Sequence, residues 1–315
     1  MANVALDRQS AEQPSQKWPA SLLPRGRAIT LDLIRASLAR VGLKVSRVRA
    51  DDIGDYRRIY SADSLANRRF YNVGAGSFSH AFWTNLDFPS KWYGEVQRAV
   101  TPYDLMSGQA LPVEDGTAEI IYTSHTVEHV TDRAVERFFR NAFRALRLGG
   151  ILRVATGPDA DSNFRALEAG DADWFYWDVG YDGAFEQYSN IFHQPPSGRP
   201  LEERWLHHFA SQLAPNDRSP SAHKFSAAAI REIIAERGKI GALDYFTGLC
   251  EFQPDRPFNH VSWWNAEKLV RFMRQAGFET IYRSGYGQSA AQVLRNTHFF
   301  DNTHPQMTVY VEARR

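Results

Sequence analysis

The chain is poor in cysteine, because only one of its 315 residues, Cys250, carries a thiol. A single thiol cannot form an intramolecular disulfide or supply several cysteine ligands to zinc. The sequence therefore excludes a disulfide-bonded scaffold and a cysteine-based zinc module. We expect Cys250 to be a small buried side chain rather than a nucleophile.

The chain also lacks a long apolar run and an excess of charge. No run of about 18 apolar residues occurs, so no membrane-spanning helix is predicted. The first 27 residues lack the apolar core of a signal peptide, and we expect a flexible polar tail on a cytoplasmic protein. The net charge of +1 predicts neither a nucleic acid nor an anionic membrane as partner.

Short apolar stretches typical of strands alternate with helical patterns. The stretches RRFYNVGAG, WTNLDF, VTPYDL, AEIIYTS and ILRVATG predict strands, and a helix is predicted from Asp132 to Leu148. A further helix, from Asn265 to Gly277, precedes the strand patterns ETIYRSGYG and QMTVYVEARR. This alternation is typical of an α/β fold with a parallel sheet.

The stretch over 161–262 has a looser pattern and is rich in aromatic residues and histidine. It contains one clear predicted helix, from Ser226 to Arg237. We predict five parts for the chain: a flexible tail over 1–27, a helical segment over 28–66, an α/β core over 67–160, an insert over 161–262, and a helix with two strands over 263–315 that completes the core sheet.

Glycines and polar residues follow four of the predicted strands. An open α/β sheet binds its ligand at the carboxyl ends of its strands, so these residues are candidates for one site. Gly74 and Gly76 let the backbone approach a nucleoside without a Cβ in the way. Asp87 ends the next strand and can accept both hydroxyls of a ribose. Asp104 is placed to meet an adenine, although either aspartate could instead cap a turn.

A dinucleotide-binding fold fits these residues less well. Its fingerprint requires a glycine where this chain has Ser79. Its acidic residue follows the first glycine by about 20 residues, whereas Asp87 follows Gly74 by 13. An NAD-linked oxidoreductase is therefore the disfavoured alternative.

Taken in order, FYNVGAG, NLD, YDL, LPVEDGTAEIIYTSHTVEHV and LRLGGILRVATGPD resemble the class I S-adenosylmethionine (SAM)-dependent methyltransferases. The resemblance implies a seven-stranded, mostly parallel Rossmann-like sheet with an antiparallel last strand, an aromatic-rich helical insert, and SAM as cofactor. It places the glycines around the methionine portion, Asp87 at the ribose, and Ser124 and His125 near the sulfonium. The link between Gly76 and Asp87 is shorter than the common pattern. The implied cofactor site comprises Asn72, Gly74, Ala75, Gly76, Asp87, Asp104, Leu105, Ser124 and His125.

The later stretches LHHFASQ, NHVSWWN, SGYGQS and RNTHFFDNTHP resemble a bacterial subgroup linked to surface-polysaccharide synthesis. This resemblance implies O-methylation of a sugar hydroxyl on a polysaccharide or its precursor, with the insert forming the acceptor pocket and glycan-synthesis enzymes as partners. Its aromatic residues could stack on a sugar ring or simply form a core. A small natural product is the second acceptor class. A catalytically silent module that assists a glycosyltransferase is the alternative outside enzymes.

Methyl transfer to an alcohol requires a base that removes the hydroxyl proton. Histidine suits this role near neutral pH, and histidines are concentrated between residues 193 and 260, with His125 at the end of a predicted strand. We predict that the base is one of His125, His208 and His260. For each of them a purely structural, hydrogen-bonded histidine is the alternative.

The pattern His125-x-x-Glu128-His129 has the spacing of an inverted zinc-protease motif. A protease requires this motif inside a helix, whereas here it straddles a predicted strand end and the next helix. We therefore expect Glu128 and His129 to orient the loop by hydrogen bonds, with no metal bound. A catalytic metal at these residues remains the alternative.

Overall fold

The computed structural model describes residues 51–90 and 100–315, all of which belong to one unit that spans Val48–Arg315. The tail predicted over 1–27 and the first part of the predicted helical segment, residues 28–50, lie outside the described residues. Cys250 is half-buried, and burial raises the pKa of its thiol to about 12. The thiol is therefore protonated near neutral pH, as expected for a residue that is not a nucleophile.

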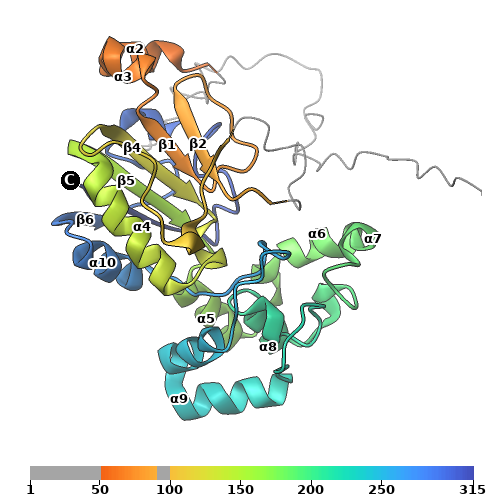
Figure 1. The fold of residues 1–315 in the computed structure, drawn as a ribbon. Helices are drawn as coiled ribbons and strands as arrows, with labels where there is room; N and C mark the ends of the chain where they lie inside the picture. Colours follow the sequence, from red (N-terminus) through yellow and green to blue (C-terminus); the bar gives the residue numbers. More distant parts are fainter. Residues whose placement is uncertain (1–50, 91–99) are drawn as a thin grey trace, which may run out of the picture. The chain divides into compact units, whose positions relative to one another are not determined.

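Seven strands form one sheet in the part of the chain that the structure describes, in the order β3-β2-β1-β4-β5-β7-β6 (Figure 1). The first five strands pair in parallel, whereas β7 runs antiparallel to both β5 and β6. The predicted mostly parallel, Rossmann-like sheet is thereby confirmed. The strands are β1 (Phe70–Val73), β2 (Trp83–Asp87), β3 (Thr101–Pro102), β4 (Ala118–Ser124), β5 (Leu146–Thr156), β6 (Thr280–Arg283) and β7 (Val309–Arg314).

The central strands are buried on both faces, which explains their nearly continuous apolar sequences. In β4, Ile121 packs into one core, while Ile120 and Tyr122 pack into another on the opposite face. This alternation follows from the two-residue period of a strand. Two cores on two faces fix the register, because a slip by one residue would exchange their side chains.

One face of the sheet packs against α4 (Asp132–Ala145) and α10 (Ala266–Gln275). The buried side of α4 carries the apolar residues that the sequence pattern marked, including Phe138 and Ala142. The helix ends three residues earlier than predicted. Leu146 already has extended backbone angles and begins β5, because it pairs with Ala118 of β4.

The third strand is also shorter than predicted, with two residues in place of the stretch VTPYDL. Pro102 has no backbone N–H to extend the ladder. Two residues later, the Asp104 side chain accepts a hydrogen bond from Met106 N and starts the 3₁₀ turn η2 (Leu105–Ser107). The chain thus leaves the sheet just before the predicted ligand residue.

The opposite face of the sheet carries an aromatic core that includes Tyr56, Trp83 and Phe300. Tyr56 comes from α2, in the segment predicted to be helical, whereas Phe300 comes from the long connection between β6 and β7. Residues far apart in the chain thus share this core. The elements on this side are α2 (Ile53–Ile59), α3 (Ala62–Ala66) and η7 (Gln292–Arg295).

The stretch between β5 and α10 is helical and has its own core around Trp205, Phe209 and Phe246. The predicted helix over 226–237 is the first half of α9, in which Gly238 interrupts the helical backbone with φ of 69°. Within the described ranges, 51–90 and 100–315, no helix has the length and apolar character needed to cross a membrane. The elements are α5 (Ala160–Ala169), η4 (Ala172–Phe175), α6 (Trp177–Gly183), α7 (Phe185–Tyr188), η5 (Pro196–Gly198), α8 (Leu201–His207), η6 (Ser211–Leu213) and α9 (Ala227–Gly248).

Candidate active site

A cavity of about 500 Å³ lies at the carboxyl ends of β1, β2 and β4. This volume is in the range of sites for small molecules. The structure brings all nine residues of the predicted cofactor site to its wall, although they are spread over more than 50 positions of the sequence. These are Asn72, Gly74, Ala75, Gly76, Asp87, Asp104, Leu105, Ser124 and His125.

The turn after β1 requires glycine at position 74 for two reasons. Gly74 has φ of 71°, a left-handed conformation that L residues rarely adopt. A Cβ there would also overlap the side chain of Thr126, which follows β4. The Thr126 hydroxyl lies 3.1 Å from the Ser124 carbonyl oxygen. The turn after β1 and the end of β4 therefore meet closely at the cavity wall.

Asp87 is held in place at the end of β2 by the backbone of both neighbouring segments. Its Oδ2 accepts a hydrogen bond from Gly76 N at 2.7 Å, and its Oδ1 accepts one from Phe88 N at 2.7 Å. A carboxylate oxygen can accept more than one hydrogen bond. Asp87 can therefore orient the glycine turn and still bind the hydroxyls of a ligand.

Asp104 caps the turn that follows β3 and also lines the cavity. Its Oδ1 accepts a hydrogen bond from Met106 N at 2.7 Å, which is the turn-capping alternative considered for this residue. Leu105 is buried in the core below and presents an apolar surface to the same cavity. This pairing of a carboxylate with an apolar side chain suits a heteroaromatic ring that carries an amino group.

His125 follows β4 and is paired with a buried carboxylate. Its Nδ1 lies 3.0 Å from Glu128 Oε1, and its Nε2 lies 2.8 Å from the Thr308 hydroxyl oxygen. Glu128 Oε2 accepts a hydrogen bond from the Thr156 hydroxyl at 2.8 Å. Burial alone would raise the pKa of Glu128, but the hydrogen bond and charge of His125, with His129 and His260, lower it to about 2. Glu128 is therefore ionised and holds the His125 ring.

Part of the cavity wall, here called the far wall, comes from segments outside the predicted cofactor site. The connection between β6 and β7 contributes most of it, and the insert contributes Phe252 and Pro257. The stretch RNTHFFDNTHP is among those that resemble the bacterial subgroup, but no local pattern in it indicates that it reaches this cavity. The cavity residues from this connection are His298, Phe299, Asn302 and Thr303.

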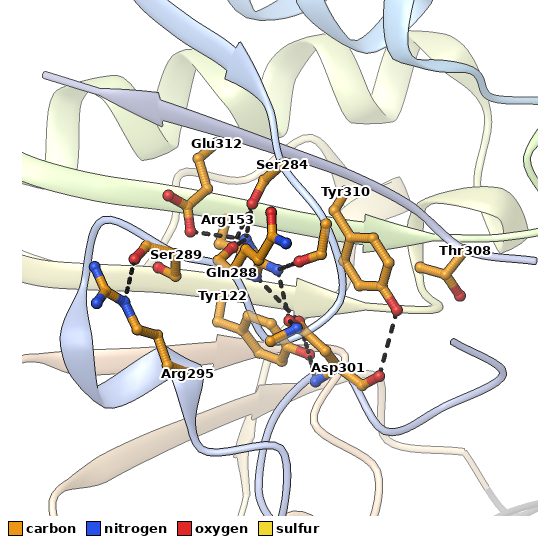
Figure 2. Close-up of polar contacts among 12 residues, drawn as sticks. Tyr122, Arg153, Ser284, Gln288, Ser289, Arg295, Asp301, Thr308, Tyr310 and Glu312 are labelled. Atoms are coloured by element: carbon orange, nitrogen blue, oxygen red, sulfur yellow. Dashed lines mark hydrogen bonds and ion pairs between the residues drawn. The ribbon is translucent and has the colours of Figure 1, made fainter. Parts of the chain in front are cut away.

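A buried arginine ties this connection to the sheet (Figure 2). Arg153, on β5, has no exposed surface, and its guanidinium pairs with the carboxylates of Asp301 and Glu312. It also donates to the carbonyl oxygens of Gly285 at 2.9 Å and Gln288 at 2.8 Å. Because Asp301 lies between the cavity residues Phe299 and Asn302, Arg153 fixes the position of the far wall.

A comparison with protein-family models agrees with this geometry. Residues 73–154, from the end of β1 to β5, match the model described as a methyltransferase domain. The chain therefore contains a SAM-dependent methyltransferase domain. No curated protein matched the chain.

Solved methyltransferases resemble this methyltransferase only remotely. A SAM-dependent methyltransferase from Thermotoga maritima, described as a possible histamine N-methyltransferase, is 14% identical, with 83% of this chain and 95% of that chain covered and a TM-score of 0.35. One from Mesorhizobium loti is 15% identical, with 80% and 96% covered and a TM-score of 0.35. PigF with SAH is 12% identical, with 82% and 53% covered and a TM-score of 0.35. Likenesses this remote carry no information about the acceptor.

The cavity of the methyltransferase fits SAM, its cofactor, by the chemistry of its wall. The glycine turn leaves room for close approach, because Gly76 has nothing within 4 Å of the position of a Cβ. Asp87 supplies a carboxylate for the ribose, and Asp104 with Leu105 supplies a polar and an apolar contact for the adenine. These roles are predictions that binding measurements can test.

Replacing Asp87 by alanine should weaken SAM binding by about 10- to 100-fold, because a charged acceptor for hydrogen bonds is worth about 1.5–3 kcal/mol. Calorimetry should show this loss for SAM and for its demethylated product, and no binding of NAD by the wild type. Asp173→Ala is the matched control, since Asp173 is exposed and does not line the cavity. Unchanged affinity in Asp87→Ala would remove Asp87 from the cofactor site.

Of the three histidines predicted as the base, only His125 lines the cavity. His208 is buried in the insert, with its ring centroid 4.1 Å from that of Trp177, and burial lowers its pKa to about 4. His260 lies behind the cavity residue His129, at 4.7 Å between ring centroids. The placement of His208 is that of a structural histidine, the alternative that was left open for it.

The aromatic residues of the insert act largely as a core. Phe175, within the stretch WFYW, and Trp205 have no exposed surface. Among the residues of the insert, only Phe252 and Pro257 line the cavity. The structure therefore favours the core alternative for most of these aromatics and gives a smaller part of the cavity wall to the insert than expected.

Proposed function

We propose that the methyltransferase methylates a hydroxyl group of a sugar, on a surface polysaccharide or on its precursor. SAM supplies the methyl group. The proposal is supported first by the cavity residues outside the predicted cofactor set. Phe252 and Phe299 offer apolar faces there, while Asn302 and Thr303 offer hydrogen-bonding groups. A sugar presents the same combination, a ring with apolar faces and a rim of hydroxyl groups.

The paired residues His125 and Glu128 support an alcohol as acceptor. Glu128 can accept the Nδ1 proton of His125, which leaves Nε2 as the atom that takes a proton from a hydroxyl. In the structure the unprotonated Nε2 accepts from the Thr308 hydroxyl at 2.8 Å. This hydroxyl can donate instead to the His304 carbonyl oxygen, 2.9 Å away, which would free Nε2 for the hydroxyl of an acceptor. We therefore propose His125 as the general base, with Glu128 orienting it.

The acceptor class can be tested by comparing the glycans of the host with those of a strain that lacks the gene. We expect that deleting the gene removes one O-methyl group from a surface glycan, detected by mass spectrometry of the released glycans. The purified enzyme with SAM should restore this methyl group on the demethylated glycan or its sugar precursor. An unchanged glycan profile, together with turnover on a small natural product, would contradict the sugar acceptor and leave methyl transfer itself intact.

We propose that the methyltransferase works in the cytoplasm beside enzymes of glycan synthesis, which would supply the sugar that it methylates. Affinity purification of the tagged protein from its host would test this association. Recovery with other partners and no glycosyltransferase would contradict it.

A further inference from the structure

Three side chains with metal-binding atoms meet beside the cavity. Glu128 and His129 belong to the turn η3 (Val127–His129), and His260 comes from the segment before α10. One ligand atom from each residue lies within 4.8 Å of the ligand atoms of the other two. The sequence motif groups His125 with Glu128 and His129. Only the fold brings in His260, from more than 130 positions away.

The hydrogen bonds of the two histidines fix which nitrogen is available. His129 Nδ1 lies 3.2 Å from the carbonyl oxygen of Asn259, and His260 Nδ1 contacts the carbonyl oxygen of His208. A carbonyl oxygen can only accept, so each Nδ1 carries the proton, and each Nε2 keeps its lone pair. Histidines that bind metals are usually held in this way, by a carbonyl or carboxylate on the other nitrogen.

The Glu128 carboxylate is also held in place by hydrogen-bonding neighbours. The Thr156 hydroxyl donates a hydrogen bond to Glu128 Oε2, and His125 Nδ1 lies 3.0 Å from Glu128 Oε1. Because a carboxylate has about four positions for accepting, these contacts leave room for a further ligand. His125 thus lies beside the cluster rather than in it, and its contact with Glu128 is the one that also orients the His125 ring.

We propose that Glu128, His129 and His260 bind one divalent cation of the first transition row, such as zinc, iron, manganese or cobalt. Two imidazole nitrogens and one carboxylate oxygen suit these cations better than magnesium or calcium, which prefer oxygen ligands alone. Ligand atoms sit about 2.0–2.2 Å from such a cation, so the three side chains would draw together slightly on binding.

The bound cation would have an open coordination position that faces the cavity. Three protein ligands leave at least one position of a tetrahedral cation for water or substrate. His129 lines the cavity, so this position is within reach of a molecule bound there. This role rests on the proposed function: the cation would bind the oxygen of the acceptor hydroxyl and orient it toward the methyl group. Binding of the cation itself does not depend on that proposal.

The decisive experiment uses the untagged full-length protein and cobalt chloride alone, without SAM or acceptor. After removal of metals by chelation, we expect one equivalent of Co²⁺ to bind and to give visible absorption bands typical of nitrogen ligands. His260→Gln and His129→Gln should each lower the affinity by about 100-fold or more, since each removes one of three ligands. Glutamine at position 260 can still donate to the His208 carbonyl oxygen, which protects the local fold.

His193→Ala is the matched control, because His193 is exposed and lies outside the cluster. It should bind cobalt like the wild type, and circular dichroism should show that all variants are folded. The proposal is overturned if the wild type binds no stoichiometric Co²⁺, or if His260→Gln and His129→Gln bind as tightly as His193→Ala. Neither result bears on methyl transfer, because no acceptor is present. Conversely, a glycan profile unchanged by gene deletion would leave the cation site standing.

Discussion

Replacing His125 by asparagine is expected to lower the turnover number by about 10²- to 10⁴-fold, the usual contribution of a positioned base. Asparagine is the appropriate substitution because His125 has φ of 49°, a left-handed conformation that asparagine tolerates better than alanine. Its amide can still donate a hydrogen bond to Glu128, but it cannot accept the proton of a hydroxyl. The loss should therefore fall on the chemical step rather than on the fold.

The measurement is the rate of methyl transfer to the true acceptor at saturating SAM, together with SAM affinity by calorimetry. SAM affinity should change little. His208→Gln serves as the comparison, because His208 does not line the cavity and should retain near-normal turnover if it is structural. Near-normal turnover in His125→Asn would show that His125 is not the base. The assignment as a methyltransferase would survive that result.

Replacing Arg153 by methionine is expected to destabilise the protein by about 3–5 kcal/mol, the cost of removing one partner from a buried ion pair. Asp301 and Glu312, neither of which has an exposed side chain, would lose the guanidinium that compensates their charge. The carbonyl oxygens that Arg153 bonds would also lose their donor. The connection between β6 and β7 should loosen first, because Arg153 is its anchor on the sheet (Figure 2).

Urea unfolding measures this effect, with Arg133→Met as the matched control, since Arg133 is exposed on α4. The triple variant Arg153→Met, Asp301→Asn, Glu312→Gln should recover part of the lost stability, because it removes the uncompensated charges along with the arginine. A loss of stability in Arg153→Met no larger than in Arg133→Met would contradict the anchoring role. Where the single variant is too unstable to purify, the triple variant still allows the comparison.

The set of predicted cofactor residues that line the cavity could be picked out from the sequence because its signals are local. A strand followed by Gly74 and Gly76, or ended by Asp87, indicates a turn or a carboxylate at a known edge of a parallel sheet. The lengths of some elements were less predictable. The helical periodicity extends to Leu148, but the helix ends at Ala145 because Leu146 pairs with Ala118 of β4.

The other half of the cavity depends on contacts between distant residues. His298 and Phe299 reach it because Arg153 pairs with Asp301, nearly 150 positions further along the chain. No periodicity in RNTHFFDNTHP indicates this pairing, since it is an interaction between single side chains. For the same reason the sequence could not distinguish a histidine in the cavity from one buried in the insert, such as His208.

The sequence by itself determined the fold class, the methyltransferase domain and the set of residues around the glycine turn, because periodicity and strand-end motifs lie in neighbouring positions. Only the tertiary structure decided which histidine faces the cavity, which segments form its far wall, and which residue completes the cluster at Glu128 and His129. Those outcomes depend on burial and on the packing of the insert and the C-terminal connection against the sheet. Packing brings together residues whose separation along the chain contains no signal of their contact.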